Sequence, residues 1–135
     1  MSRSPISVVG AVIEINGNIL CARRAQRSQL GGLWEFPGGK VEMDEDPRAA
    51  LCREVSEELG CVISVGKKLI ESRYAYSFAI IQLTTYSCEL RSGSPRAIEH
   101  ADLRWLKPDL LHSLDWTPSD LPTVEYLQKR GDGAT

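Results

Sequence analysis

The sequence predicts an α/β domain in which a mixed β-sheet lies between helices. Three observations lead to this prediction: apolar, β-branched runs precede one helix with clear end signals, similar runs follow it, and a second helical segment lies near the C-terminus. The chain has 135 residues, which is enough for one hydrophobic core and too few for two. It contains no internal repeat or linker, so we expect a single domain over residues 1–135.

The first third of the chain is expected to form short strands separated by turns. Asn16-Gly17-Asn18 is a tight-turn signal that predicts a hairpin, and Pro37-Gly38-Gly39 is expected to end a strand. Residues 23–32 are polar and rich in turn-forming residues, which predicts a loop. The extended segments expected here are residues 6–15, 19–22, 33–36 and 40–42.

The clearest element is a helix over residues 47–59. Asp46 can cap its N-terminus, Pro47 suits its first position because the missing N–H costs nothing there, and Gly60 suits the position just beyond its end. Apolar residues recur at every fourth position and define a buried stripe. They are Leu51, Val55 and Leu59.

The second half of the chain predicts further strands and a terminal helix. Ser119 or Asp120 can cap this helix, and Pro122 lies in its first turn. The expected strands are residues 61–65, 68–76, 78–90 and 103–106. The expected helical segments are a short turn over residues 108–112 and the terminal helix over residues 121–129.

Composition excludes several classes of protein. Lys and Arg number 16 against 18 Asp and Glu, a net charge of −2, which argues against a protein that grips a nucleic-acid polymer. No apolar run is long enough to span a membrane, and no signal-peptide core follows Met1. The four cysteines form no CxxC pair and have apolar neighbours, so we expect reduced core thiols. A cytoplasmic monomer or weak dimer is expected.

Three glutamates on the first helix form the strongest candidate for chemistry. Glu54, Glu57 and Glu58 fall at about 0°, 300° and 40° around the helix axis, at the edge of the buried stripe. Such carboxylates repel one another unless a cation lies between them, and oxygen ligands favour Mg²⁺, with Mn²⁺ as a substitute. Taken alone, the helix allows another interpretation, in which the glutamates form a solvated face and Arg53 pairs with Glu57 at the surface.

The flanking pattern favours the first interpretation. Gly39, five residues, Glu45, seven residues and then Arg53-Glu54-Val55-Ser56-Glu57-Glu58-Leu59-Gly60-Cys61 resemble the signature of the Nudix hydrolases. Cys61 departs from the larger aliphatic residue that is usual in the family. The resemblance extends from about Val8 to about Leu127 and is greatest to the MutT-like branch, with members of the CTP pyrophosphohydrolase and 8-oxo-dGTP diphosphatase types.

The resemblance implies roles for the residues of this segment. Glu54, Glu57 and Glu58 would hold Mg²⁺ together with the Gly38 carbonyl. Glu54 matches the residue proposed as general base and Arg53 the one that orients it, whereas Glu45, Gly39 and Gly60 have structural roles. Glu99 matches a downstream glutamate that contributes to the metal site or to the base role, although an exposed loop acid is an equal alternative.

The resemblance also implies a nucleotide site. Arg23 matches a nucleotide-contacting arginine, and Arg24 and Lys40 are further candidates for the phosphates. An ionised Asp120 would accept hydrogen bonds from a base edge, unless it only caps the terminal helix. Trp34 or Phe36 would stack on the base, unless they belong to the core.

The implied reaction converts a nucleoside triphosphate into a monophosphate and pyrophosphate by attack of water at the β-phosphorus. The substrate would be a free (d)NTP of the cytidine type or an oxidised nucleotide, and the purpose nucleotide-pool sanitation. Two alternatives stay open. Tyr76 lies near the spacing of a tyrosine in hydrolases of dinucleoside polyphosphates, and a non-catalytic nucleotide sensor would have the same fold.

Overall fold

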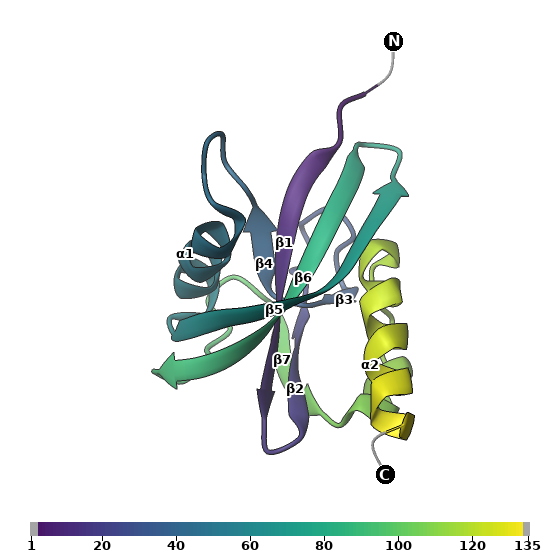
Figure 1. Cartoon of the computed structure of the whole chain (residues 1–135). Coiled ribbons are helices and arrows are strands. Elements are labelled where there is room, and N and C mark those ends of the chain that lie inside the picture. Colours follow the sequence, from purple (N-terminus) through teal and green to yellow (C-terminus); the bar gives the residue numbers. More distant parts are fainter. Residues whose placement is uncertain (1–2, 134–135) are drawn as a thin grey trace.

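A computed structural model describes residues 3–133 and contains a seven-stranded mixed sheet (Figure 1). In chain order the elements are β1 (Ile6–Ile15), β2 (Asn18–Arg23), β3 (Trp34–Glu35), β4 (Gly38–Lys40), α1 (Pro47–Leu59), β5 (Val62–Ala75), β6 (Ile80–Ser92), β7 (Asp102–Leu106), the 3₁₀ helices η1 (Pro108–Ser113) and η2 (Pro118–Asp120), and α2 (Leu121–Gly133). The strand order is β3-β2-β1-β6-β5, with β4 paired to β1 and β7 to β2. β1 and β6 are parallel and the other pairs are antiparallel, which confirms the predicted mixed sheet.

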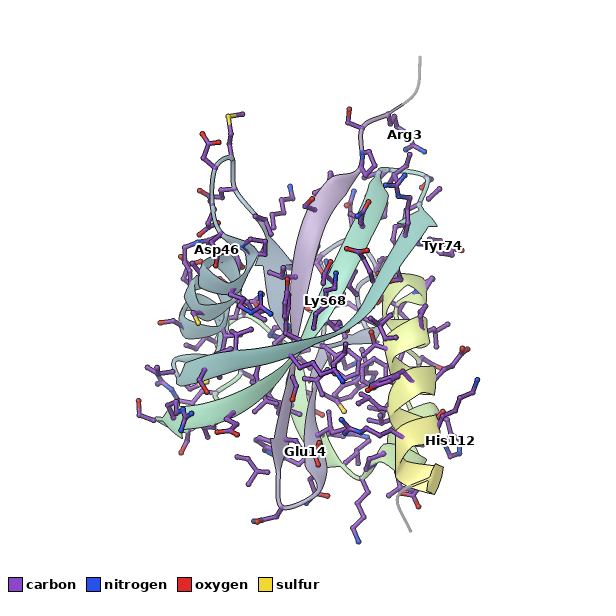
Figure 2. The ribbon with its side chains drawn as sticks, in the orientation of Figure 1. Arg3, Glu14, Asp46, Lys68, Tyr74 and His112 are labelled. Carbon is purple, nitrogen blue, oxygen red and sulfur yellow. The ribbon has the colours of Figure 1, made fainter. Side chains whose placement is uncertain are left out.

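The two helices cover opposite faces of the sheet (Figure 1). Alternate residues of a strand point to opposite faces, and β1 shows this directly. Val9, Ala11 and Ile13 pack in one core cluster with the buried stripe of α1, whereas Val12 packs in a second cluster that includes residues of α2. Figure 2 shows Asp46, at the start of α1, and His112, beside α2, on opposite flanks of the molecule.

The segment predicted as two strands, residues 61–65 and 68–76, is one long strand, β5. Its register against β6 shifts between Val65 and Lys68 and again between Lys68 and Ile70. Gly66 lies between these irregular positions, and a glycine inside a strand commonly marks a bulge.

Gly38 and Gly39 belong to a strand instead of ending one. They pair with Gly10 and Val9 of β1, so the strand expected at residues 40–42 lies at Gly38–Lys40. A Cβ atom at Gly38 would overlap the carbonyl oxygen of Val9. Glycine is therefore required here by the close approach of two backbones.

The remaining predictions need only small corrections. The terminal strand and both helical segments lie where they were expected, although α2 extends to Gly133 and the turn η2 precedes it. The four cysteines are free, and Cys21, Cys61 and Cys88 are buried, as predicted. Between residues 3 and 133, no helix combines the length and the apolar character needed to cross a bilayer.

Candidate active site

The ends of α1 are set by the residues that the sequence indicated. The Asp46 carboxylate accepts a hydrogen bond from the Ala49 N–H at 3.1 Å, and Pro47 is the first helical residue. Gly60 adopts φ 67°, and its N–H donates to the Ser56 carbonyl. These signals place the glutamates of α1 beside β4.

Arg53 connects the helix to the loop that precedes it. Its Nε and Nη2 donate to the two carboxylate oxygens of Glu45 at 2.9 and 3.0 Å, and Nη2 also donates to the Lys40 carbonyl at 3.2 Å. Its Nη1 donates to Glu54 at 2.8 Å, which is the contact expected of a residue that orients Glu54. The Arg53 guanidinium lowers the pKa of Glu45 to about 2, helped by the Glu42 N–H. Glu45 is therefore ionised at neutral pH and holds the Arg53 guanidinium in place.

Glu54 lies directly against the backbone of β4. A Cβ atom at Gly39 would overlap the Glu54 carboxylate, so glycine at this position leaves room for that side chain. Burial raises the pKa of Glu54, although the Arg53 guanidinium opposes the shift. A carboxylate with a raised pKa is a better proton acceptor than an exposed one.

Glu57 and Glu58 lie in different surroundings. The Glu57 side chain is 57% exposed, and its carboxylate lies 3.5 Å from Arg53 Nη1. Glu58 is half-buried and accepts a hydrogen bond from the Gly38 N–H at 3.1 Å. Burial, and then the charges of Glu35, Glu54 and Glu99, raise the pKa of Glu58 to about 9.

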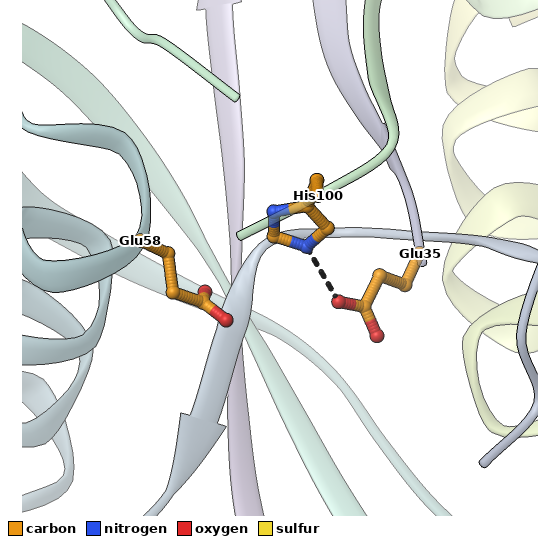
Figure 3. A group of neighbouring side chains, drawn as sticks. All are labelled: Glu35, Glu58 and His100. Atoms are coloured by element: carbon orange, nitrogen blue, oxygen red, sulfur yellow. Dashed lines mark hydrogen bonds and ion pairs between the residues drawn. The ribbon is translucent and has the colours of Figure 1, made fainter. Parts of the chain in front are cut away.

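Two residues near Glu58 were missed as site residues in the sequence. Glu35 accepts hydrogen bonds from Arg24 Nη1 at 2.7 Å and pairs with His100 Nε2 at 2.9 Å (Figure 3). Glu35, Glu58 and His100 each offer one ligand atom within 4.8 Å of the others, and no other such group of three is found in the described part of the chain. The pair Glu35–His100 joins positions 65 residues apart, so no local spacing could have revealed it.

The acidic site is chemically suited to a divalent cation. The carboxylates around Glu58 repel its negative charge, and this repulsion contributes to its raised pKa. A bound cation would relieve the repulsion. Glu99 is exposed in its loop but lines the same cavity as Glu58 and His100. The three helix glutamates lie on one edge of α1 but have different partners. Glu54 and Glu57 contact the Arg53 guanidinium, whereas Glu58 accepts a hydrogen bond from the Gly38 N–H.

The cavity that Glu58, Glu99 and His100 line has a volume of about 130 Å³. A larger cavity of about 220 Å³ lies next to it and shares Arg24 and Glu35 with it. Arg24, Lys40, Phe36 and Asp120 line it, together with Gly38 and Gly39 of β4. Two residues that are expected to contact the ligand, Arg23 and Trp34, do not line this cavity. Arg23 is exposed and donates to the Gly32 carbonyl, and Trp34 is a buried core residue with the Arg104 guanidinium over its ring. Phe36 belongs to the same core cluster, with its ring 4.7 Å from that of Trp116, and it lines the cavity as well.

Asp120 lines this cavity and is 5% exposed. It accepts hydrogen bonds from the Phe36 N–H at 3.4 Å and from the Thr117 hydroxyl. These contacts, and its place in η2, correct the alternative in which Asp120 caps the terminal helix. Burial raises its pKa to about 7, with a further contribution from Glu35, while the Thr117 hydroxyl opposes the shift.

Tyr76 is engaged within the protein. Its hydroxyl donates to Ser119 Oγ at 2.9 Å and accepts from the Ser119 N–H at 2.9 Å, and the residue is buried. Ser119 is also the alternative cap of the terminal helix in the sequence prediction, and its hydroxyl instead bonds Tyr76. A tyrosine committed in this way gives no support to the dinucleoside-polyphosphate alternative.

Comparison with known proteins agrees with the resemblance found in the sequence. Residues 8–125 match the NUDIX domain family. The chain is 42% identical over 120 residues to the CTP pyrophosphohydrolase of Escherichia coli (strain K12), with 89% of each chain covered. It is 37% identical over 132 residues to the "Putative 8-oxo-dGTP diphosphatase 2" of Mycobacterium tuberculosis (strain ATCC 25618 / H37Rv), with 96% of this chain and 92% of the relative covered.

Solved structures give the same result for the fold. The solution structure of the E. coli ORF135 protein matches with a TM-score of 0.83 at 38% identity, covering 98% of this chain and 96% of the other. The predicted resemblance and fold class are thus confirmed. The chain belongs to the Nudix family, and it is a Nudix hydrolase.

Proposed function

We propose that this Nudix hydrolase is a Mg²⁺-dependent pyrophosphohydrolase of free nucleoside triphosphates of the cytidine or oxidised type, with a role in nucleotide-pool sanitation. One observation carries the proposal. Gly38 and Gly39 line the larger cavity and at the same time contact Glu58 and Glu54. A nucleotide whose base lies in the cavity would therefore extend its phosphates toward the carboxylates. The names of the two relatives support this substrate class.

In this proposal the metal ligands are the carboxylates of Glu54, Glu57, Glu58 and Glu99 and the carbonyl oxygen of Gly38. When bound, Mg²⁺, or Mn²⁺ in its place, neutralises charge on the phosphate oxygens. Glu54, held by Arg53, takes a proton from the attacking water. The water oxygen bonds to the β-phosphorus, and the bond from that phosphorus to the oxygen that bridges it to the α-phosphorus breaks. The monophosphate leaves with that oxygen, and pyrophosphate is the second product.

The phosphate-binding role expected of Arg23 is proposed for Arg24 together with Lys40. Both line the cavity, and Lys40 is exposed at its edge. Arg24 is already fixed by its pair with Glu35 and by a 2.8 Å hydrogen bond from its Nε to the Gln29 carbonyl. Prior ordering of this kind lowers the entropic cost of ligand binding.

Phe36 and Asp120 are proposed to bind the base. An aromatic ring of the kind at Phe36 can stack on any base. Asp120 has a pKa of about 7, so the ionised form, which only accepts hydrogen bonds, coexists near neutral pH with a protonated form that can also donate one. A base edge rich in donors, such as the cytosine amino group, suits the ionised form.

The proposal extends to the state and partners of the chain. In this proposal the enzyme is a cytoplasmic monomer or weak dimer that takes small nucleotides. The net charge of −2 supports one part of it, that no nucleic-acid polymer is a partner.

The first test replaces Glu57 with Gln. The Glu57 side chain is exposed and contacts Arg53 only at 3.5 Å, so the substitution removes charge with little effect on packing. Mg²⁺-dependent release of pyrophosphate should fall by at least about 100-fold, while the melting temperature stays close to that of the wild type. Glu125→Gln, at an exposed position of α2, is the matched control and should keep full activity. Full activity of Glu57→Gln would refute the proposed metal site.

The second test compares kcat/KM for dCTP, 5-methyl-dCTP, CTP and 8-oxo-dGTP. One substrate should exceed the weakest by about tenfold or more, and Asp120→Asn should change the order, because an amide offers both donors and acceptors. Equal, slow turnover of all four by the wild type would contradict a base-reading role for Asp120.

A further inference from the structure

Phe78 is an exposed aromatic residue in the wall of the larger cavity. Among the described residues, the aromatic side chains that line this cavity are those of Phe36, Tyr76 and Phe78, and these residues are 3%, 7% and 39% exposed. The ring of Phe36 also packs against Trp116 in the core. Phe78 is therefore the one of the three with a large accessible surface.

The turn that carries Phe78 does not itself require a phenylalanine. Residues 76–79 connect β5 to β6, and the Tyr76 N–H donates to the Ala79 carbonyl at 2.8 Å. Turns of this kind favour Gly, Asn, Asp, Pro and Ser, which adapt to the backbone. Phenylalanine is not one of them, and it leaves apolar surface in water. Exposed apolar surface at a cavity is typical of a ligand-binding groove.

Contacts within the protein hold the ring of Phe78 in a fixed relation to Asp120. The ring stacks on Tyr76, with centroids 5.1 Å apart and planes inclined by 13°. The Tyr76 hydroxyl exchanges two hydrogen bonds of 2.9 Å with Ser119, and Asp120 is the next residue in the chain. An aromatic ring and a carboxylate of the same cavity are thus ordered before a ligand binds, which lowers the entropic cost of binding.

We propose that the base of the nucleotide stacks on the ring of Phe78 while Asp120 binds the edge of the base. The inference rests on the proposed function, and it adds to Phe36 a second and more exposed ring. Every base has a π face, so stacking accepts all of them, whereas hydrogen bonds to the edge distinguish one base from another. Phe78 therefore determines how tightly a nucleotide is held, and Asp120 determines which one.

This division of roles predicts a particular kinetic effect for Phe78. The ring lies in the wall of the base cavity and outside the group of glutamates on α1. A contact that is equally strong with the bound substrate and with the transition state lowers KM and leaves kcat unchanged. Loss of the ring should consequently raise KM alone.

The direct test follows the phenylalanine rings of the wild-type chain by NMR. The chain contains two phenylalanines, so labelling with ¹³C-phenylalanine reports only on Phe36 and Phe78. The α,β-imido analogues of dCTP and dGTP, added with Mg²⁺, replace the proposed scissile oxygen by nitrogen. Nuclear Overhauser contacts should join the base protons to the Phe78 ring, and its signals should shift. Inorganic triphosphate, which has no base, should leave them unchanged.

The same experiment separates failure of this inference from failure of the proposed function. An analogue that binds, but whose base contacts only Phe36 or neither ring, would overturn the inference and leave the proposed function intact. Failure of both analogues to bind would also refute the inference. Turnover of the four triphosphates then decides whether the proposed function fails with it. Because the wild-type chain is used, the result does not depend on the folding of a variant.

Variants separate base stacking from a structural role of the ring. Phe78→Leu keeps an apolar side chain without a π face, and it should raise KM for each triphosphate by about tenfold while kcat stays within about twofold. Phe78→Tyr keeps the π face and should keep KM within about threefold of the wild-type value.

Tyr74→Leu is the matched control for these variants (Figure 2). Tyr74 is exposed, its ring centroid lies 4.6 Å from that of Tyr76, and it is not among the residues that line the cavity. Its replacement disturbs the aromatic contacts of the hairpin without removing a ring from the cavity, so KM should not change. An equal rise of KM in Tyr74→Leu and Phe78→Leu, or an unchanged KM in Phe78→Leu, would refute stacking on Phe78.

Discussion

At the scale of single residues, two adjacent glycines show how one small strand serves both the fold and the site. A side chain at Gly38 would overlap the backbone of β1, whereas the nearest atoms to a side chain at Gly39 all belong to the Glu54 side chain. Gly38 therefore has its main role in the sheet and Gly39 in leaving room for a candidate catalytic group. The same substitution at the two positions should consequently have different effects.

We expect Gly39→Ala to lower kcat/KM by about 100-fold, because a shift of the order of 1 Å in a proposed general base has effects of that size. Its melting temperature should change little, since the Glu54 side chain can move where a backbone cannot. Gly38→Ala should instead lower the melting temperature strongly, as measured by circular dichroism. An active Gly39→Ala enzyme, or a Gly38→Ala protein as stable as the wild type, would contradict these roles.

At the scale of elements, the β5–β6 hairpin is fastened to η2. The Ser72 hydroxyl of β5 donates to the Ser119 carbonyl at 2.7 Å, and Tyr76 exchanges two hydrogen bonds with Ser119. Asp120 follows Ser119 directly, and both residues line the larger cavity with Tyr76. The hairpin therefore holds the proposed base-reading carboxylate in place.

Tyr76→Phe should weaken discrimination between bases. The substitution removes two hydrogen bonds at Ser119 and leaves the ring, which stacks on Phe78 at 5.1 Å. A loss of about 1 kcal/mol in positioning corresponds to a fall of about fivefold in the ratio of kcat/KM between the best and worst triphosphates. Tyr74→Phe, two residues earlier near the end of β5 and 44% exposed, is the control (Figure 2). A uniform loss of activity on all substrates would show a role in stability alone.

At the scale of the whole molecule, the features that could be predicted are those that depend on residues close together in the chain. The caps of α1, its buried stripe and the glutamates at its edge all depend on residues within one helix and its flanks. The grouping of Glu35, Glu58 and His100 joins β3, α1 and the loop before β7, and the choice of Arg24 over Arg23 depends on how the chain leaves the end of β2 beside the cavity. Such contacts follow from the way the sheet assembles, and a single sequence contains no local signal for them.

The assembled site also concentrates negative charge in a molecule of nearly balanced composition. The net charge is −2, yet the charges of Glu35, Glu54 and Glu99 all act to raise the pKa of Glu58. The repulsion among these carboxylates lowers the stability of the folded protein at the place where a cation can bind. Active sites commonly lose stability in this way.

This cost should be visible as a fall in stability with rising pH. The pKa of Glu58 is about 9 in the folded protein and near 4.5 when unfolded, so between these values the folded state holds a proton that the unfolded state has released. The free energy of unfolding should then decrease as pH rises, by at most about 1.4 kcal/mol per pH unit. Asp120, with its folded pKa of about 7, contributes in the same direction mainly below pH 7.

Urea unfolding between pH 7 and 8.5, in the presence of a chelator, tests the effect of Glu58 by comparing the wild type with Glu58→Gln. Asp120, with a pKa of about 7 in the folded protein, and the thiols of Cys21 and Cys88, whose pKa burial raises to about 12, also lower stability as pH rises, and they do so equally in both proteins. The wild type should lose stability across the window, and Glu58→Gln should lose markedly less, because its amide does not titrate. Saturating Mg²⁺ should stabilise the wild type more at pH 8.5 than at pH 7, since the ion binds the ionised carboxylate. A wild-type stability that is constant or rises over this window would mean that Glu58 is already ionised at neutral pH, and that the cation is not needed to relieve its burial.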